Sequence, residues 1–272
     1  MEPEYGSRAK GNNFMSNYDW THYAFGDDLI TDQYQQFYDN WEILIQNDQK
    51  LAQFAEEVGE IEDTIVPENY MQLWNKINLP IQIQKANNYN LTKEHALRCF
   101  EGLHKRAYYL VKIARFFNAK NILEVGTSQG WQYFSFAEYA KDVQGHVWSC
   151  DVRDVRHKES VEKYSNNTTF HYGQSDTLKN VVGDKKIDMF YIDGAHDKHS
   201  VLRDVYNLQD VQADECVWVF DDFDHRFGCF EDIKNLCTYY NRCKVYNVGE
   251  AASGNPSHQA IIFGKIGINT SR

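Results

Sequence analysis

The pattern of hydrophobic and polar residues changes near residue 120. Before that point, apolar residues recur at the spacing of an α-helix, and neither a strand pattern nor an internal repeat is found. Pro80 is expected to close one helix, because proline cannot donate the hydrogen bond that a helix interior requires. A Gln/Asn-rich connector is predicted over residues 82–90, and Thr92 is the expected N-cap of the helix that follows. The predicted helices cover residues 31–57, 68–77 and 92–117.

After residue 120, short apolar runs alternate with amphipathic segments. The predicted strands are Asn121–Val125, His146–Asp151, Thr168–Tyr172, Ile187–Ile192, Cys216–Asp221, Lys244–Val248 and Gln259–Gly264. The predicted helices between them cover residues 130–140, 156–164, 199–210 and 228–241. Strands that alternate with helices form a parallel sheet covered on both faces. Residues 249–258 are too few for a helical crossover, so the last two strands are expected to pair antiparallel.

The expected fold is therefore an α/β, three-layer Rossmann-like sandwich. Its seven-stranded sheet is mostly parallel with an antiparallel last strand. Residues 91–272 form the main domain, and residues 1–90 form a helical N-terminal extension that acts as a lid, an acceptor pocket or an oligomer contact. Aromatic residues of the extension are expected to pack helices or subunits, with an acceptor pocket as the alternative. They are Tyr18, Trp20, Tyr23, Phe25, Tyr34, Trp41 and Trp74.

Composition and charge argue against several classes of partner. No run approaches the roughly 20 apolar residues of a membrane helix, and residues 1–13 lack the apolar segment of a secretion signal. The net charge is −11 and no basic run exceeds a pair, which argues against nucleic acid and anionic membranes. Most of the six cysteines lie in apolar stretches, for example Cys150, Cys216 and Cys237. Buried free thiols and a reducing, cytoplasmic location are therefore expected.

The stretch from Glu124 to Gly130 carries the first sign of chemistry. Small residues at Gly126, Ser128 and Gly130 let the backbone turn tightly after a buried strand and let a ligand approach it closely. The helix that follows presents free N–H groups and the positive end of its dipole to that ligand. Glu124 is expected to reach a ligand hydroxyl, because a buried carboxylate needs a partner.

Three kinds of site share this strand–turn–helix outline. A dinucleotide site has G-x-G-x-x-G, and no third glycine follows on schedule here. A serine hydrolase has G-x-S-x-G, which would make Ser128 the nucleophile with Asp221 and His258 as partners, although that turn usually follows several strands. The stretch also resembles the first motif of class I S-adenosylmethionine-dependent methyltransferases, E/D-x-G-x-G-x-G, with serine for the middle glycine. A non-catalytic nucleoside-binding protein of the same fold is the remaining alternative.

Acidic residues follow the next predicted strands at the same edge of the sheet. Asp151 ends the second strand, where a carboxylate can accept hydrogen bonds from ribose hydroxyls. Ser175 and Asp176 follow the third strand, a position that contacts the adenine in the family that the chain resembles. The resemblance thus implies a set of residues that hold S-adenosylmethionine. They are Glu124, Gly126, Thr127, Ser128, Gly130, Asp151, Ser175, Asp176 and Asp193.

The fourth and fifth strands end in Y-I-D-G-A-H and F-D-D. The sheet is expected to bring Asp193 close to Asp221 and Asp222, and a divalent cation would relieve the repulsion of three carboxylates. Oxygen ligands favour Mg²⁺, with Mn²⁺ or Ca²⁺ as alternatives. In the other interpretation, Asp221 and Asp222 cap the following loop and stay solvated. The two segments resemble a methyltransferase branch with cephalosporin-hydroxylase-like proteins and metal-dependent sugar O-methyltransferases, which implies that these three aspartates bind metal.

The general base is the point where the chain departs from the sugar methyltransferases, which have an aspartate at the position of Ala195. His196 is the expected substitute, because an imidazole near carboxylates can act as a base around neutral pH; alternatively it holds the turn and Asp193. His199 and His225 are weaker candidates. The expected function is methyl transfer from S-adenosylmethionine to an oxygen of a small molecule, such as a sugar, with His196 and Asp193 as catalytic residues. Residues 249–258 line the acceptor or form a simple hairpin loop, and the N-terminal helices are the expected contact of a homo-oligomer.

Overall fold

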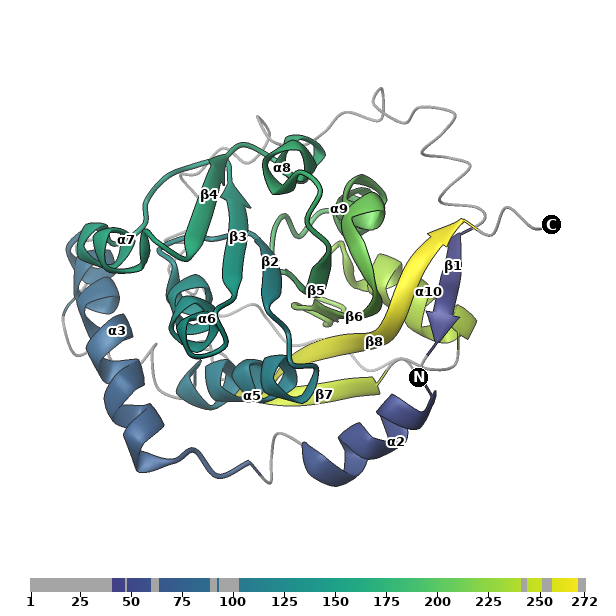
Figure 1. The fold of residues 1–272 in the computed structure, drawn as a ribbon, viewed down its shortest axis with the longest axis horizontal. Helices are drawn as coiled ribbons and strands as arrows, with labels where there is room; N and C mark the ends of the chain where they lie inside the picture. Colours follow the sequence, from purple (N-terminus) through teal and green to yellow (C-terminus); the bar gives the residue numbers. More distant parts are fainter. Residues whose placement is uncertain are drawn as a thin grey trace, which may run out of the picture.

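The apolar runs after residue 120 form the strands of one mixed sheet, and helices cover both of its faces (Figure 1). The computed structural model describes residues 41–46, 48–59, 64–88, 92, 103–240, 244–250 and 256–268. The strands are β1 (Trp41–Gln46), β2 (Asn121–Val125), β3 (His146–Asp151), β4 (Thr168–Tyr172), β5 (Ile187–Ile192), β6 (Gln212–Phe220), β7 (Lys244–Glu250) and β8 (Pro256–Ile268). The helices are α2 (Asp48–Glu57), α3 (Glu68–Asn88), α5 (Leu103–Phe116), α6 (Trp131–Asp142), α7 (Lys158–Tyr164), α8 (Ser175–Val182), α9 (Ser200–Leu208) and α10 (Phe230–Tyr240).

The strand order is β1-β8-β6-β5-β2-β3-β4, and β7 also pairs with β8. Strands β2 to β6 pair in parallel, whereas β8 runs antiparallel to β6, β7 and β1. The chain builds β2, β3 and β4 outward in one direction and then returns to place β5 on the other side of β2. This confirms the predicted Rossmann-like sheet with an antiparallel last pair. Among the described residues the sheet has eight strands, one more than predicted.

The extra strand is β1, and it corrects the prediction of a helix over residues 31–57. Residues 41–46 are extended and pair with β8 from Trp41↔Ile268 to Gln46↔Gly264, and helix α2 begins only at Asp48. Residues 31–40 lie outside the described residues. β8 continues past the part that pairs with β6, and β1 covers the edge that would otherwise stay open. The apolar residues of W-E-I-L-I-Q fit a strand as well as a helix, so tertiary pairing decides.

Helix α3 also differs from the prediction. It runs through Pro80 to Asn88 and includes the stretch predicted as a connector. Trp74, Ile77 and Ile81 lie on both sides of the proline and are buried, so packing of both halves offsets the hydrogen bond that Pro80 cannot make. Helix α5 lies inside the helix predicted over residues 92–117, whose part from 93 to 102 is outside the described residues.

Helix α8 was not predicted at all. Its eight residues begin at Ser175, in a stretch whose Gly, Ser and Asp residues are typical of a turn. Leu178 and Val182 are buried one turn apart. Two apolar residues at helical spacing are too few to indicate a helix from the sequence.

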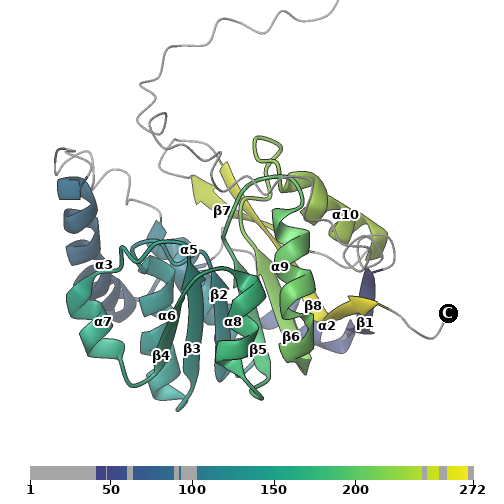
Figure 2. The same cartoon turned by 90° about the horizontal axis from the view of Figure 1, so that it is seen from above.

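The residues of each central strand alternate between two apolar cores. Ile122, Met189 and Val217 belong to the core that contains the buried residues of α3, α5 and α6. Leu123, Phe190 and Trp218 belong to the core formed with α8, α9 and α10, where the rings of Phe190 and Trp218 stack 3.8 Å apart. Figure 2 shows α8 and α9 on one side of the sheet and α5 and α6 on the other. Full burial of each large apolar side chain contributes roughly 1.5–3 kcal/mol, so the sheet is a firm support for the loops at its edge.

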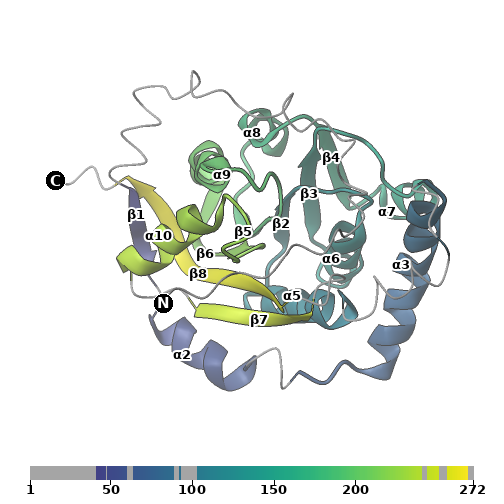
Figure 3. The same ribbon diagram turned by 180° about the vertical axis from the view of Figure 1, so that it is seen from behind.

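Helices α2 and α3 of the N-terminal segment lie along the outer side of the face that α5 and α6 cover (Figure 3). Trp74 packs in that core, as predicted for the aromatic residues of this segment. Tyr18, Trp20, Tyr23, Phe25 and Tyr34, and the side chain of Trp41, lie outside the described residues. None of the described helices is long and apolar enough to cross a membrane. The thiols of Cys150 and Cys216 are free and buried, as predicted, whereas the side chain of Cys237 lies outside the description.

Candidate active site

Three loops at the carboxyl edge of the sheet are fixed by hydrogen bonds that continue the parallel ladder. The backbone N–H of Gly126 donates to the carbonyl of Cys150 (3.0 Å), that of Asp193 to Val125 (2.9 Å), and that of Asp221 to Ile192 (2.9 Å). Each loop is thus locked to the end of the neighbouring strand. The loops after β2 and β5 meet where the strand order reverses, which is where ligands of such sheets bind.

The turn after β2 needs its two glycines. Gly126 has φ +92°, and a Cβ there would lie 1.9 Å from the carbonyl oxygen of Asp193. Gly130 has φ +95°, and a Cβ there would lie 2.4 Å from the ring of Phe134. Ser128, the residue that replaces a glycine of the family motif, has a left-handed φ of 48°. Within the described residues, Gly130 precedes α6 without a side-chain cap, and the positive end of the α6 dipole therefore lies at this turn.

The adjacent strand β3 supplies Asp151 beside this turn. Its Oδ2 accepts the backbone N–H of Ser128 (2.7 Å), and its Oδ1 accepts the backbone N–H of Arg153 (2.9 Å). The carboxylate therefore shapes the turn and stays partly exposed at the place predicted for a ribose.

Glu124 has a partner inside the protein. The side chain is buried and accepts a hydrogen bond from Ser149 Oγ (3.0 Å), whose hydroxyl also contacts Thr127. Burial raises the pKa of Glu124 well above its usual range, against the opposing hydrogen bond from Ser149. The predicted contact between Glu124 and a ligand hydroxyl is therefore not required to explain its burial.

Ser175 does not present its side chain at the site surface. It is 3% exposed; its hydroxyl donates to Asp204 Oδ1 (2.6 Å) and accepts from Asn207 Nδ2 (2.9 Å), which ties α8 to α9. Burial raises the pKa of Asp204 to about 6 despite the hydrogen bond from Ser175. Of the pair predicted for the adenine, only the side chain of Asp176 is exposed.

The half of the site at the ends of β5 and β6 is centred on Arg106, which comes from α5. Its Nη2 group donates to Tyr191 Oη, to Asp221 Oδ2 and to Asp193 Oδ2, the last at 3.2 Å. The second oxygen of Asp221 accepts from Gln259 Nε2 (3.2 Å), and the Asp221 side chain is 2% exposed. Burial raises the pKa of both Asp193 and Asp221, whereas the charge of Arg106 lowers it.

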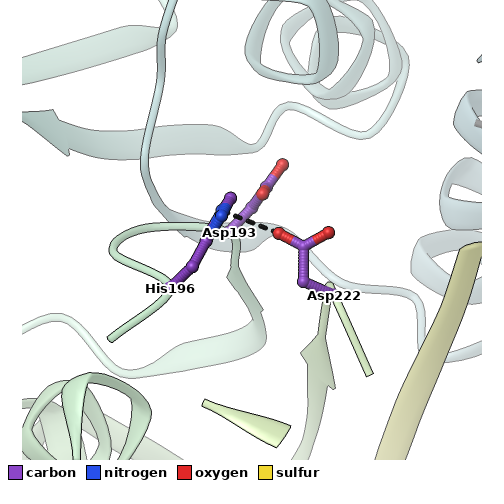
Figure 4. A group of neighbouring side chains, drawn as sticks. All are labelled: Asp193, His196 and Asp222. Atoms are coloured by element: carbon purple, nitrogen blue, oxygen red, sulfur yellow. Dashed lines mark ion pairs between the residues drawn. The ribbon is translucent and has the colours of Figure 1, made fainter. Parts of the chain in front are cut away.

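His196 and Asp222 form a pair next to this network (Figure 4). His196 Nε2 lies 2.7 Å from Asp222 Oδ2, and the histidine side chain is about half exposed. Burial lowers the pKa of His196, but the hydrogen bond and the charge of Asp222 outweigh it and raise that pKa to about 9. The protonated imidazole is therefore favoured at neutral pH, and the role of His196 as a base stays a prediction. The basic form grows as the pH rises toward 9.

The predicted metal ligands are divided among different partners. Asp221 is held by Arg106 and Gln259, Asp193 is shared with Arg106, and Asp222 faces His196. Ligand atoms of Asp193, His196 and Asp222 do lie within 4.8 Å of one another. A divalent ion bound there would also face Arg106, a fixed cation that contacts Asp193. The predicted set of Asp193, Asp221 and Asp222 therefore does not fit a metal in this arrangement.

The weaker histidine candidates lie outside this network. His199 pairs with Asp232 of α10 (3.4 Å), and His225 is 84% exposed beside Asp224 (3.5 Å). In the hydrolase alternative, Ser128 Oγ donates to Gln129 Oε1 (2.9 Å), an amide oxygen that cannot act as its base. The proposed partner Asp221 is bound to Arg106. The side chain of His258 and residues 251–255 of the predicted acceptor loop lie outside the described residues.

Sequence reasoning missed Arg106, Tyr191 and Gln259 as parts of the site. A signal for Arg106 does exist, because it follows Leu103 by three residues and precedes Leu110 by four, inside the apolar stripe of its helix. A cation at such a position needs a buried acidic partner. The partners lie 85 to 115 residues away, and no local pattern identifies them.

Comparison with known proteins agrees with the fold. Residues 123–223 match the family model described as a methyltransferase domain. The matched segment begins within β2, ends three residues after β6, and leaves out Arg106 and Gln259. A search among curated protein sequences gave no match for the chain.

Several solved methyltransferase structures share the fold at low sequence identity. The O-methyltransferase TomG from Streptomyces achromogenes, involved in tomaymycin synthesis and in complex with SAM, is 12% identical with a TM-score of 0.52 and covers 86% of this chain and 100% of its own. The O-methyltransferase from Bacillus cereus in complex with SAH is 13% identical with a TM-score of 0.52 and covers 78% and 96%. The SAH-bound methyltransferase PaMTH1 from Podospora anserina is 14% identical with a TM-score of 0.50 and covers 82% and 99%. The predicted resemblance to class I S-adenosylmethionine-dependent methyltransferases is thereby confirmed at the level of the fold.

Proposed function

We propose that this protein transfers a methyl group from S-adenosylmethionine to an oxygen atom of a small-molecule acceptor. The observation that carries the proposal is the meeting of two loops at the reversal of strand order. The uncapped α6 terminus and the Gly126 turn lie on one side, and the Asp193 loop lies directly against Gly126. These loops fall within the segment that matches a methyltransferase domain, and relatives of the same fold are described as SAM- or SAH-bound.

The cofactor would be held on the β2–β3 side. Gly126, Ser128 and Gly130 leave room for close approach of a ligand to the backbone, and the α6 terminus offers N–H donors. The Asp151 carboxylate is the acceptor for ribose hydroxyls, with Asp176 beside the adenine. When bound, S-adenosylmethionine supplies a methyl group that its sulfonium already activates.

The acceptor would bind on the β5–β6 side, beside His196 and Asp222. Asp222 holds Nε2 of the imidazole, which fixes the ring and leaves Nδ1 to take the proton of the acceptor hydroxyl. The remaining contribution of the protein is to align the acceptor oxygen with the donor methyl group. Because the pKa of His196 is about 9, the rate is expected to rise with pH toward that value. The net charge of −11 favours a small-molecule acceptor, such as a sugar, over nucleic acid.

Isothermal titration with S-adenosylhomocysteine tests the cofactor site. We expect the wild type to bind with micromolar affinity and Asp151→Ala to lose binding, because the variant lacks the ribose acceptor and loosens the turn at Ser128. Asp154→Ala is the matched control, since Asp154 lies three residues further on, is exposed and pairs with Arg156. Failure of the wild type to bind would overturn the proposal. Labelling of Ser128 by a fluorophosphonate probe would then support the hydrolase.

A further inference from the structure

The carboxylates at the acceptor side already have a cation among them. Arg106 reaches from α5 over the ends of β5 and β6 and contacts both Asp193 and Asp221. Tyr191 Oη lies 3.1 Å from Asp193 Oδ2 and 3.2 Å from Asp221 Oδ2, so it ties the two carboxylates to the same centre. The guanidinium also lies over the Tyr191 ring, with Cζ 5.9 Å from its centroid.

Burial distinguishes this contact from an ordinary surface ion pair. The side chains of Arg106 and Asp221 are 19% and 2% exposed, and both oxygens of Asp221 have partners within the protein. A buried carboxylate without a cation would be strongly disfavoured, so the position of Arg106 is coupled to the presence of both aspartates. A guanidinium keeps its charge at any ordinary pH and offers several donors in a fixed plane, which suits it to hold two carboxylates at once.

We infer that Arg106 is the built-in cation of this site and that it takes the place of a divalent metal between Asp193 and Asp221. The inference deepens the proposed function, on which it rests for the use of the site in methyl transfer. Arg106 is a positioning residue here: it fixes Asp193 beside the Gly126 turn and leaves Asp222 to orient His196. Arg106 lies outside the segment that matches the methyltransferase domain, so the cation comes from a helix in front of it.

The charges around the cluster agree with this role. The guanidinium of Arg106 faces the carboxylates of Asp193 and Asp221, and the imidazole of His196 pairs with Asp222. A divalent ion added to this arrangement would lie close to the guanidinium. Two like charges about 4 Å apart repel by several kcal/mol even with substantial screening. Without Arg106, the same aspartates would form an open oxygen cluster of the kind that binds Mg²⁺ or Mn²⁺.

The test is a titration of the full chain with Mn²⁺, followed by electron paramagnetic resonance of the free ion. The variants are Arg106→Gln, Arg106→Lys and Arg115→Gln. The last is the matched control, because Arg115 lies on the same helix and is exposed. We expect no stoichiometric Mn²⁺ binding by the wild type, Arg106→Lys or Arg115→Gln. Arg106→Gln is expected to bind one Mn²⁺ at least about tenfold more tightly than the wild type, because the aspartates lose their cation.

Stoichiometric binding of Mn²⁺ by the wild type that Asp221→Asn abolishes would overturn the inference. If Arg106→Gln fails to fold, the wild type and Arg106→Lys still decide, because stoichiometric Mn²⁺ binding by either that Asp221→Asn abolishes contradicts a built-in cation. S-adenosylhomocysteine binding is measured in parallel in EDTA, where the wild-type affinity should be unchanged. Loss of cofactor binding with no Mn²⁺ uptake would refute the proposed function and leave Arg106 as the resident cation.

Discussion

On the β2–β3 side of the site the backbone does the positioning, whereas on the β5–β6 side charged side chains do it. The first half consists of a turn with two left-handed glycines, a carboxylate that holds the turn, and an uncapped helix end. The second half is a network in which Arg106 joins Asp193, Asp221 and Tyr191. The first half has a local signature in the sequence and tolerates little change in shape. The second depends on residues far apart in the chain and tolerates little change in charge.

The largest effect is expected from Gly126→Ala. The added Cβ would meet the Asp193 carbonyl at 1.9 Å, and neither backbone segment can move without breaking the ladder between β2 and β5. We expect the free energy of unfolding to fall by about 3–5 kcal/mol in urea titrations. Gly183→Ala is the control, because Gly183 has φ +63° but no atom within 4 Å of its Cβ position, so about 1–2 kcal/mol is expected. Equal losses in the two variants would show that backbone contact does not govern this half.

A somewhat smaller loss is expected when the network loses its cation. Arg106→Gln should lower the free energy of unfolding by about 3 kcal/mol, because two carboxylates then lack a charged partner. The double variant Arg106→Gln with Asp221→Asn should cost clearly less than the sum of the single changes, since each removes the same interaction. Additive losses in denaturant titrations would contradict a coupled ionic network.

The buried carboxylate of Asp204, which accepts a hydrogen bond from Ser175, gives a prediction for the contact between α8 and α9. Its pKa of about 6 in the folded protein exceeds the usual value of an aspartate, so the folded state binds the proton more tightly. The contribution of Asp204 to stability therefore falls as the pH rises from about 4 to 6 and is then constant. Asp204→Asn removes this cost and should stabilise the protein by about 2–3 kcal/mol at pH 8, with the gain vanishing below pH 4. A gain that is the same at both pH values would rule out the titration of Asp204 as its source.

Ser128→Gly should have the smallest effect. It restores the glycine of the family motif at a residue with φ +48°, where relief of backbone strain and loss of chain stiffness nearly cancel. The affinity for S-adenosylhomocysteine should stay within about threefold of the wild type. A loss of more than tenfold in calorimetry would assign the Ser128 hydroxyl a direct role in binding.

The same division explains how much the sequence could predict. The seven strands after residue 120 and the Gly126 turn have local signatures, and all were found at or near their predicted positions. β1 was missed because its pairing with the far end of β8 joins residues more than 200 positions apart. Asp221 was placed at the correct edge of the sheet, but its partner Arg106 lies on a helix 115 residues earlier. The sequence predicts charge repulsion among Asp193, Asp221 and Asp222, but only the fold identifies Arg106 as the cation that relieves it.

Methyl transfer from radiolabelled S-adenosylmethionine to a library of sugars and other hydroxylated compounds, with EDTA present throughout, tests the central claim most directly. The account predicts labelled product in EDTA, no increase when excess Mg²⁺ is added, and loss of product in His196→Ala. Product that forms only with added Mg²⁺ would contradict it, because Arg106 would then not be the cation on which the site depends.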